Sequence, residues 1–169
     1  MKETIFYNSP VGLLSIANNG DAISEILFVK TENQSEINAI KKRITKPVTP
    51  ILQKCIAQLD DYFTGKNLYF DLPIMQQGTP FQQRVWNGLL SILPGKTLSY
   101  QKFSKRLGNE KAIRAVGTAN GKNNVCIVVP CHRVIGSNGS LVGYGGGLWR
   151  KQWLLQHEAK YCNGVQSMF

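Results

Sequence analysis

The chain has 169 residues, 43% of them hydrophobic, and a formal net charge of +10 at pH 7. This length suits one or two compact domains, and no run approaches the roughly twenty apolar residues that cross a bilayer, so we expect no membrane partner. Residues 79–169 carry twelve lysines and arginines against two acids, whereas residues 1–78 carry eight of each. A basic half of this kind indicates an anionic partner, and nucleic acid is the obvious candidate.

The cysteines and the N-terminus indicate the compartment. The first residues lack the apolar core of a secretory signal, and the four cysteines are scattered along the chain. We therefore expect a cytoplasmic protein with reduced thiols. Cys126 and Cys131 have no second Cys/His pair to complete a zinc set, so we expect no metal and no cofactor.

The first half predicts a small antiparallel sheet with a helix packed on it, a supporting domain over residues 1–75 without a catalytic pattern. Strands are expected at residues 4–7, 12–17 and 22–29, with Asn19-Gly20 as a hairpin turn. Residues 30–47 are polar, with room for a short helix. Thr49-Pro50 and Gly65 mark the ends of the main helix. Its apolar stripe consists of Leu52, Cys55, Ile56, Leu59, Tyr62 and Phe63.

The stretch from Pro73 to Pro80 predicts a linker, and residues 79–169 a second, mostly helical domain. Thr79-Pro80 begins a helix that Pro94-Gly95 ends. Its apolar face consists of Phe81, Val85, Leu89 and Ile92.

Two short helices follow, with a glycine turn between them. Ser99 caps the first, over residues 100–107, Gly108-Asn109 makes the turn, and the second runs from residue 110 to about 120. This is the helix-turn-helix plan, whose second helix can enter a DNA groove. Five cations lie on the unit: Lys102, Lys105, Arg106, Lys111 and Arg114.

The most informative segment lies near residue 130. An apolar run, Ile127–Val129, predicts a buried strand that stops at Pro130 and presents Cys131 beside His132. A basic, turn-rich setting favours the thiolate, which is the nucleophilic form of cysteine. The alternative is an inert, buried cysteine. Neighbouring side chains on a regular strand point to opposite faces, so a link between thiol and imidazole needs a backbone turn, a water or a third residue.

The second half resembles the O6-alkylguanine-DNA alkyltransferase family, in order and with compatible spacing over residues 79–160. The first half fits only loosely, as a ribonuclease H-like sheet-plus-helix domain. The resemblance implies a two-domain α+β fold, with a winged helix-turn-helix-like second domain. The matching motifs are Pro130–Val134, Phe81–Trp86, Ser99-Tyr100, Arg114–Gly117, Asn123, Gly143–Leu148 and Trp153–Glu158.

The resemblance also implies roles for individual residues. Cys131 accepts the alkyl group, His132 generates the thiolate through a bound water, and Glu158 orients His132. Asn123 braces the loop that holds these groups. As an ordinary structural alternative, Glu158 is a solvated acid on an otherwise apolar helix.

Further residues are implied to hold the alkylated nucleotide. Tyr100 donates a hydrogen bond to the ring of the leaving guanine or rotates its phosphate, and the Gly145 N–H faces the guanine oxygen. Carbonyls near Cys131 and Val134 read the exocyclic amine. Outside this family, Tyr100 and Tyr144 are simply packing aromatics. The other predicted contacts to base or DNA are Tyr144, Arg114 (which enters the base stack), Ala115, Lys111 and Arg133, the last as a phosphate contact or an internal tether.

The implied activity is repair of double-stranded DNA by a monomer. An alkyl group on guanine O6, and on thymine O4, passes irreversibly to Cys131 after the base flips out of the duplex. Because a thioether is a poor leaving group, each molecule acts once. No zinc and no phosphotriester-sensing domain are expected, and residues 164–169 are unassigned. Asn124 and Cys126 replace prolines that some relatives carry, which loosens the loop before Cys131.

Two other functions remain open at this stage. A DNA-binding module without a reactive thiol would use the helix-turn-helix alone, but relatives that only bind lesions replace the cysteine. A cysteine hydrolase would draw thiol and imidazole from distant segments and would not need the basic half.

Overall fold

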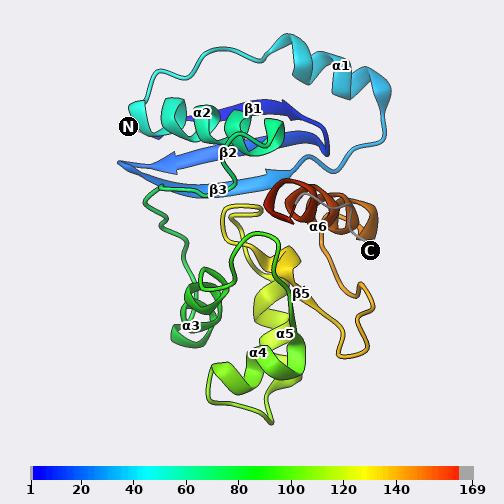
Figure 1. The fold of residues 1–169 in the computed structure, drawn as a ribbon. Coiled ribbons are helices and arrows are strands. Elements are labelled where there is room, and N and C mark those ends of the chain that lie inside the picture. The colour runs from blue at the N-terminus through cyan, green and yellow to red at the C-terminus, as the bar shows by residue number, and fades with distance from the viewer. Residues whose placement is uncertain (1, 164–169) are drawn as a thin grey trace. The chain divides into compact units, whose positions relative to one another are not determined.

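The computed structural model describes residues 2–163 and divides into two compact units, Met1–Gln76 with Asn124–Cys126, and Gln77–Asn123 with Ile127–Phe169 (Figure 1). The first unit holds an antiparallel sheet and its helices, and the second is mostly helical. The predicted mixed fold class is therefore confirmed. Among the described residues, no helix is long and apolar enough to cross a membrane.

The framework of the first unit is a three-stranded sheet in the order β1 (Thr4–Ser9), β2 (Gly12–Asn19) and β3 (Ala22–Phe28). The turn from β2 to β3 contains Gly20, whose φ of 64° suits a residue without a Cβ. Ile16 on β2 pairs with Ile26 on β3, and both side chains are fully buried. The sheet thus supplies one side of the core of this unit.

Helix α2 (Pro50–Thr64) packs against β2 and β3 and supplies the other side of that core (Figure 1). It begins after Thr49 and ends at Gly65, as predicted. The Thr49 hydroxyl does not cap the helix, because it donates to Glu3 Oε1 at 2.8 Å instead. The Glu3 carboxylate also accepts the N–H groups of Val48 and Thr49, so a residue from the start of the chain satisfies these donors.

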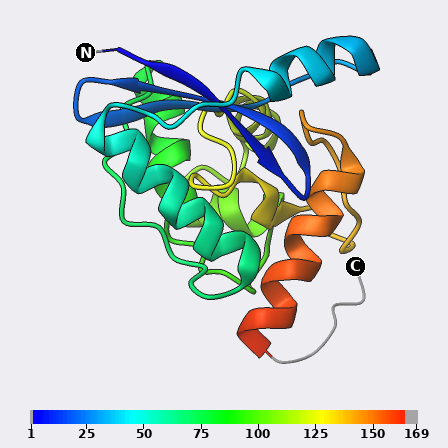
Figure 2. The same ribbon diagram turned by 90° about the horizontal axis from the view of Figure 1, so that it is seen from above.

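The short helix expected between residues 30 and 47 is α1 (Gln34–Lys42). Asn33 caps it by accepting hydrogen bonds from the N–H groups of Ser35 and Glu36. None of its residues is buried, and Figure 2 shows α1 at the edge of the first unit, apart from α2.

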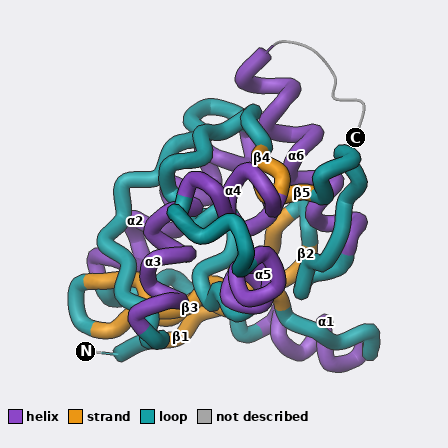
Figure 3. The backbone as a smooth tube through the Cα atoms, turned by 90° about the horizontal axis from the view of Figure 1, so that it is seen from below, coloured by secondary structure: helices purple, strands orange, loops and turns teal. Residues whose placement is uncertain are grey.

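In the second unit, α5 (Ile113–Gly121) packs against both α3 (Pro80–Leu89) and α4 (Tyr100–Arg106) (Figure 3). Helix α3 begins at the predicted Thr79 cap but ends at Leu89, before the Pro94-Gly95 stop. The bond from Ile92 N–H to the Leu89 carbonyl, at 3.0 Å, tightens the chain into a turn there.

The predicted pair of short helices is present as α4 and α5. Ser99 caps α4, and Gly108 turns the chain with a φ of 77°. Helix α5 begins at Ile113, three residues later than predicted, because the Ala112 N–H closes a turn onto the Asn109 carbonyl at 3.1 Å. Lys111 therefore lies in the turn and not on the second helix.

The strand predicted over Ile127–Val129 does not form. Val125 alone bridges Ile26, and Ile127 then adopts a φ of 74°, a left-handed conformation that is rare for a β-branched residue. A 3₁₀ helix, η1 (Cys131–Arg133), follows, and then β5 (Val134–Ile135), which pairs in parallel with β4 (Leu98–Ser99). The strand thus comes after the cysteine and not before it.

Candidate active site

Cys131 is the first residue of η1, directly after Pro130. Its N–H donates to the Val129 carbonyl at 2.8 Å, and the Arg133 N–H donates to the Pro130 carbonyl at 3.1 Å. A 3₁₀ helix turns once in about three residues, whereas strand side chains alternate between two faces. The side chains of Cys131 and His132 therefore need not point in opposite directions, as they would on a regular strand. The backbone turn that a link between thiol and imidazole requires is present.

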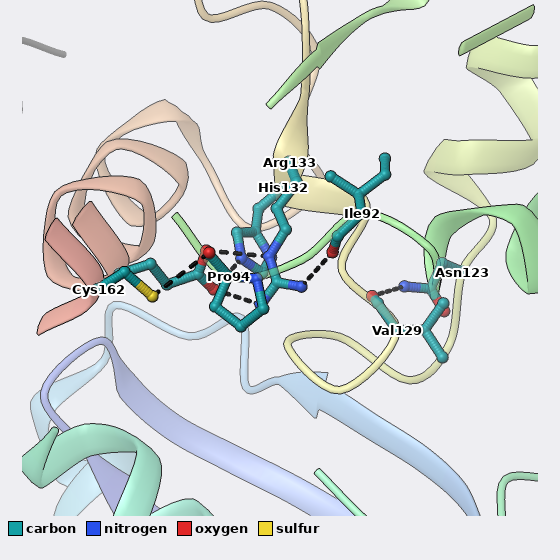
Figure 4. Close-up of polar contacts among 8 residues, drawn as sticks. Ile92, Pro94, Asn123, Val129, His132, Arg133 and Cys162 are labelled. Atoms are coloured by element: carbon teal, nitrogen blue, oxygen red, sulfur yellow. Dashed lines mark hydrogen bonds and ion pairs between the residues drawn. The ribbon is translucent and has the colours of Figure 1, made fainter. Parts of the chain in front are cut away.

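The carboxylate of Glu158, from α6 (Leu148–Asn163), binds the two residues that follow the cysteine. His132 Nε2 lies 2.7 Å from Glu158 Oε1, and Arg133 donates to both carboxylate oxygens, at 2.8 and 2.9 Å (Figure 4). His132 and Glu158 have no exposed side-chain surface. The alternative that Glu158 is a solvated acid is therefore wrong.

The protonation of this network follows from burial and charge. Burial lowers the pKa of His132 more than the neighbouring Glu158 raises it, so the imidazole is neutral near pH 7. Burial would raise the pKa of Glu158, but His132 and Arg133 outweigh that effect and hold it well below its usual range. A neutral imidazole facing a carboxylate carries its proton on Nε2, which leaves Nδ1 as an acceptor. Nδ1 is buried and has no hydrogen-bond partner in the described part of the chain.

Arg133 is an internal tether and not a phosphate contact. Its guanidinium binds Glu158 twice, and its Nη1 donates to the Ile92 carbonyl at 2.6 Å (Figure 4). The residue is only 5% exposed. We therefore correct its assignment to the DNA-contacting residues, because a buried guanidinium whose three nitrogens all donate within the protein cannot reach a phosphate without breaking this network. The adjoining Cys162 thiol donates to the Pro94 carbonyl at 3.3 Å (Figure 4).

Asn123 is buried at the start of the loop that leads to Cys131. Its Nδ2 donates to the Val129 carbonyl at 2.8 Å (Figure 4). This bond spans the irregular residues around Ile127 and holds the chain two residues before the cysteine. The contact is of the kind expected for a residue that braces this loop.

Tyr100, the first residue of α4, is half-buried. A residue that the sequence did not single out links it by hydrogen bonds to the backbone of Cys131. Asn120, on α5, donates from Nδ2 to Tyr100 Oη at 3.2 Å and to the Cys131 carbonyl at 3.3 Å. Asn120 is almost completely buried. The signal in the sequence was only its position among the apolar residues of α5, next to Ala119 and Val116.

Lys151 is a second functional candidate that the sequence analysis missed. Its side chain is completely buried, and Nζ donates to the carbonyls of Val134 at 2.6 Å and Val142 at 2.9 Å. Burial lowers its pKa to about 8, although the charge of Cys131 acts in the opposite direction. It lies seven residues before Glu158, on the same face of α6, and that spacing could have indicated it. Lys151 thereby ties the loop over residues 136–147 to the segment after the cysteine.

The glycine-rich segment that the sequence analysis assigned to the base lies in that loop. The Gly147 N–H donates to the Tyr144 carbonyl at 2.9 Å, and Arg150 Nη1 donates to the Gly146 carbonyl at 2.7 Å. A Cβ built on Gly145 would meet nothing within 4 Å, so the backbone at Gly145 is open to close approach. The Val134 carbonyl accepts a hydrogen bond from Lys151 Nζ at 2.6 Å.

The residues assigned to the duplex divide between α5 and the turn before it. Arg114 and Ala115 are exposed near the start of α5, whereas Val116 and Ala119 are buried. Lys111 is exposed in the turn. No group of three or more His, Cys, Asp or Glu side chains within residues 2–163 is placed to hold a metal ion.

Both halves of the chain match models of a single family. Residues 80–160 match the 6-O-methylguanine DNA methyltransferase DNA binding domain, and residues 4–76 match the ribonuclease-like domain of the same family. The methylated-DNA–protein-cysteine methyltransferase of Mycobacterium leprae is 41% identical over 89% of this chain and 88% of its own length. The constitutive enzyme of that name from Bacillus subtilis is 43% identical over 82% of this chain and 83% of its own.

Solved structures agree with these matches. The O6-methylguanine methyltransferase of Mycobacterium tuberculosis has a TM-score of 0.81 at 38% identity, covering 96% of this chain and 95% of its own. A structure of that organism's protein in complex with DNA also has a TM-score of 0.81, over 94% of this chain and 93% of its own. With both domains matched and relatives of this identity along its length, the chain belongs to the 6-O-methylguanine DNA methyltransferase family, the methylated-DNA–protein-cysteine methyltransferases.

Proposed function

We propose that this chain repairs double-stranded DNA by moving the alkyl group of O6-alkylguanine, and of O4-alkylthymine, irreversibly to Cys131. The observation that carries the proposal is the buried series from Glu158 to His132 beside Cys131, with Nδ1 of a neutral imidazole left to accept a proton. The proteins that this chain resembles are named for methylated DNA and for a protein cysteine, which supports the same chemistry. The repair takes place in the cytoplasm and needs only a monomer.

The proposed step balances without a cofactor. His132 Nδ1 takes the thiol proton of Cys131 through a water, and the thiolate sulfur attacks the alkyl carbon. The carbon–oxygen bond to guanine O6 breaks, its electron pair stays on the guanine, and the guanine ring accepts the proton of the Tyr100 hydroxyl. The proton held by His132 then replaces it on Tyr100 through water, so that the thiol proton is in effect passed to the guanine. The thioether has no good leaving group, so the thiol is not regenerated and each molecule reacts once.

The substrate base has to leave the duplex first, because the alkyl carbon cannot meet the sulfur in line inside the base stack. In this proposal Arg114, with Ala115 and Lys111 beside it, contacts the duplex, and Arg114 fills the gap left by the base. Tyr144 and the open backbone at Gly145 hold the flipped guanine, and carbonyls near Cys131 and Val134 read its exocyclic amine. Asn123 and Arg133 keep the loop and the carboxylate network in place.

The first test is the intact mass of the protein after mixing with a duplex that carries one O6-methylguanine. We expect a gain of one methyl group per protein molecule, never more, and no gain for Cys131→Ser or with an unmodified duplex. Tight binding without any gain in mass would make this chain a damage-sensing binding module. Repeated turnover of an ester or peptide would instead favour a cysteine hydrolase. A duplex with O4-methylthymine tests the second substrate in the same way.

A second prediction concerns Arg114, which is exposed on α5. Arg114→Ala should slow single-turnover methyl transfer from duplex DNA by on the order of tenfold or more, since base flipping costs a few kcal/mol. Transfer from single-stranded DNA should change much less. Quenched reactions on both substrates measure the two rates.

The control for Arg114 is Lys102→Ala. Lys102 is exposed on α4, and this substitution also removes one cation. We expect it to weaken binding to all duplexes and to reduce the slope of log affinity against log salt by about one, with little effect on the rate at saturating DNA. Unchanged duplex repair by Arg114→Ala, with its salt-sensitive binding intact, would contradict the role given to Arg114.

A further inference from the structure

The carboxamide of Asn120 joins the hydroxyl of Tyr100 to the backbone of Cys131. One nitrogen, Nδ2, makes both contacts, at 3.2 Å to Tyr100 Oη and 3.3 Å to the Cys131 carbonyl oxygen. The three residues come from the start of α4, the end of α5 and η1, all within the second unit. In the proposed function, Tyr100 assists the leaving group and Cys131 is the nucleophile. Asn120 therefore connects these two residues.

The Cys131 carbonyl determines which way the amide faces. A carbonyl oxygen can only accept, so the atom of Asn120 that faces it has to be the NH₂ nitrogen, and this nitrogen has two hydrogens to donate. The same nitrogen contacts Tyr100, so Tyr100 Oη accepts the second hydrogen bond. The hydroxyl proton of Tyr100 is then not directed at Asn120, and no acceptor for it is found within residues 2–163.

Packing alone does not account for an asparagine at this position. Asn120 is 3% exposed, and its Oδ1 is buried without a hydrogen-bond partner in the described part of the chain. An unpaired buried acceptor destabilises a protein, and an aliphatic side chain would avoid that cost. The amide is better explained by what its nitrogen does for Tyr100.

We propose that Asn120 is a positioning residue, which orients the Tyr100 hydroxyl so that its proton points to the departing guanine. By also binding the Cys131 carbonyl, it fixes the position of that hydroxyl relative to the nucleophile. The inference rests on the proposed function, because it assigns a means of leaving-group assistance to the same site. Accepting one hydrogen bond also makes a hydroxyl a stronger donor of its own proton. Burial raises the pKa of Tyr100 and keeps it protonated, while the bond from Asn120 acts in the opposite direction.

The sharpest test is Asn120→Asp, which keeps the shape and replaces the donor by an acceptor. A carboxylate would repel the Cys131 carbonyl and would take the Tyr100 proton for itself. We expect the single-turnover rate at saturating O6-methylguanine duplex to fall by on the order of tenfold or more, with the dissociation constant for the duplex nearly unchanged. Asn120→Leu, which has neither donor nor acceptor, should lower the rate less than Asn120→Asp.

The effect of Asn120 should disappear when Tyr100 has no hydroxyl. In a Tyr100→Phe background, Asn120→Leu, which adds no charge beside Cys131, should cause little further loss of rate, since the hydroxyl through which the amide acts is gone. If the two losses multiply, Asn120 supports the fold and the inference is wrong. An unchanged rate for Asn120→Asp alone would also overturn it. If Asn120→Asp melts at a much lower temperature than the wild type, the cycle with Asn120→Leu and Tyr100→Phe alone decides between these outcomes.

Asn67→Asp is the matched control. Asn67 is exposed in the first unit, and its Oδ1 accepts from the Tyr69 N–H, a bond that an aspartate keeps. This variant adds the same charge and should react at the wild-type rate. The wild-type protein separates the two proposals. If the wild type gains no methyl group, the proposed function is wrong. If the wild type reacts and Asn120→Asp reacts equally fast, only the role of Asn120 is wrong.

Discussion

Glu158→Gln is expected to lower the free energy of unfolding by about 3–5 kcal/mol, because it leaves the charge of Arg133 buried without a counter-charge. Glu158 is completely buried and binds Arg133 through both oxygens. The same change removes the carboxylate that orients His132, so methyl transfer should slow as well. Chemical denaturation at pH 7 measures the first effect, and single-turnover transfer measures the second.

The pH dependence of this difference has a definite sign. The pKa of Glu158 is lower in the folded protein than its ordinary value of 4.5, so its contribution to stability is complete above pH 4.5 and is lost as the pH falls below it. Glutamine resembles the protonated acid, so the wild type and Glu158→Gln should converge in stability on acidification. A constant difference from pH 7 to pH 3 would show that the carboxylate charge is not the cause.

Glu110→Gln provides the control, since Glu110 and Glu158 are the two acids of residues 79–169. Glu110 is exposed and lies 3.9 Å from Lys105 Nζ. Exposed pairs of this kind contribute roughly 0–1 kcal/mol. An equal loss of stability in both variants would mean that burial of the Glu158 network does not decide its effect.

His132→Gln is expected to slow methyl transfer by about 10²–10⁴-fold, the usual contribution of a general base. The glutamine amide can still donate to Glu158, but it offers no basic nitrogen to the thiol. Raising the pH toward about 8.5, where an ordinary thiol ionises, should recover much of the rate, because the thiolate then forms without a base. A variant that stays equally slow at high pH would place the role of His132 elsewhere.

The wild-type rate should depend on pH in a matching way. The pKa of His132 is lower than its ordinary value of 6.5, so the imidazole remains a base at pH 6.5 and gains a proton only at lower pH. The rate of transfer should accordingly hold down to pH 6.5 and fall below it. The chain has one other histidine, His157, whose ring stacks on Trp153 with 4.7 Å between centroids. His157→Phe preserves that stacking and should leave the pH profile unchanged.

Local signals in the sequence predicted the helices well. The start of α2 is marked by a proline after a threonine, and its end by a glycine after the apolar stripe. Both signals are reliable because these residues act through their own backbone conformation. The irregular backbone at Ile127 could not be predicted in this way, since a β-branched residue favours the strand that the sequence suggested. Its neighbours on both sides are held by bonds to other segments, Cys126 to Ile26 and Val129 to Asn123, and the identity of Ile127 carries no sign of either.

The site divides along the same line. Cys131, His132 and Glu158 were predicted because their motif resembles a family, and the structure brings the last two into contact. Asn120 and Lys151 were missed because each donates to backbone carbonyls. Every residue has a backbone carbonyl, so the sequence does not indicate which ones accept a side-chain hydrogen bond. Arg133 could be read as a surface contact or a tether until its burial was known.

The short return of Asn124–Cys126 to the first unit has a consequence for synthesis on the ribosome. The Cys126 N–H donates to the Ile26 carbonyl at 2.9 Å, and the Ile26 N–H donates to the Asn124 carbonyl at 2.8 Å, so these residues cover the outer edge of β3. Pro73–Met75 pairs with Ile23 at one end of β3, but the part around Ile26 stays open until about three-quarters of the chain has been made. A fragment that ends at Pro80 would keep the pairing of Ile23 with Pro73–Met75 but would present an unpaired strand edge around Ile26 to other chains.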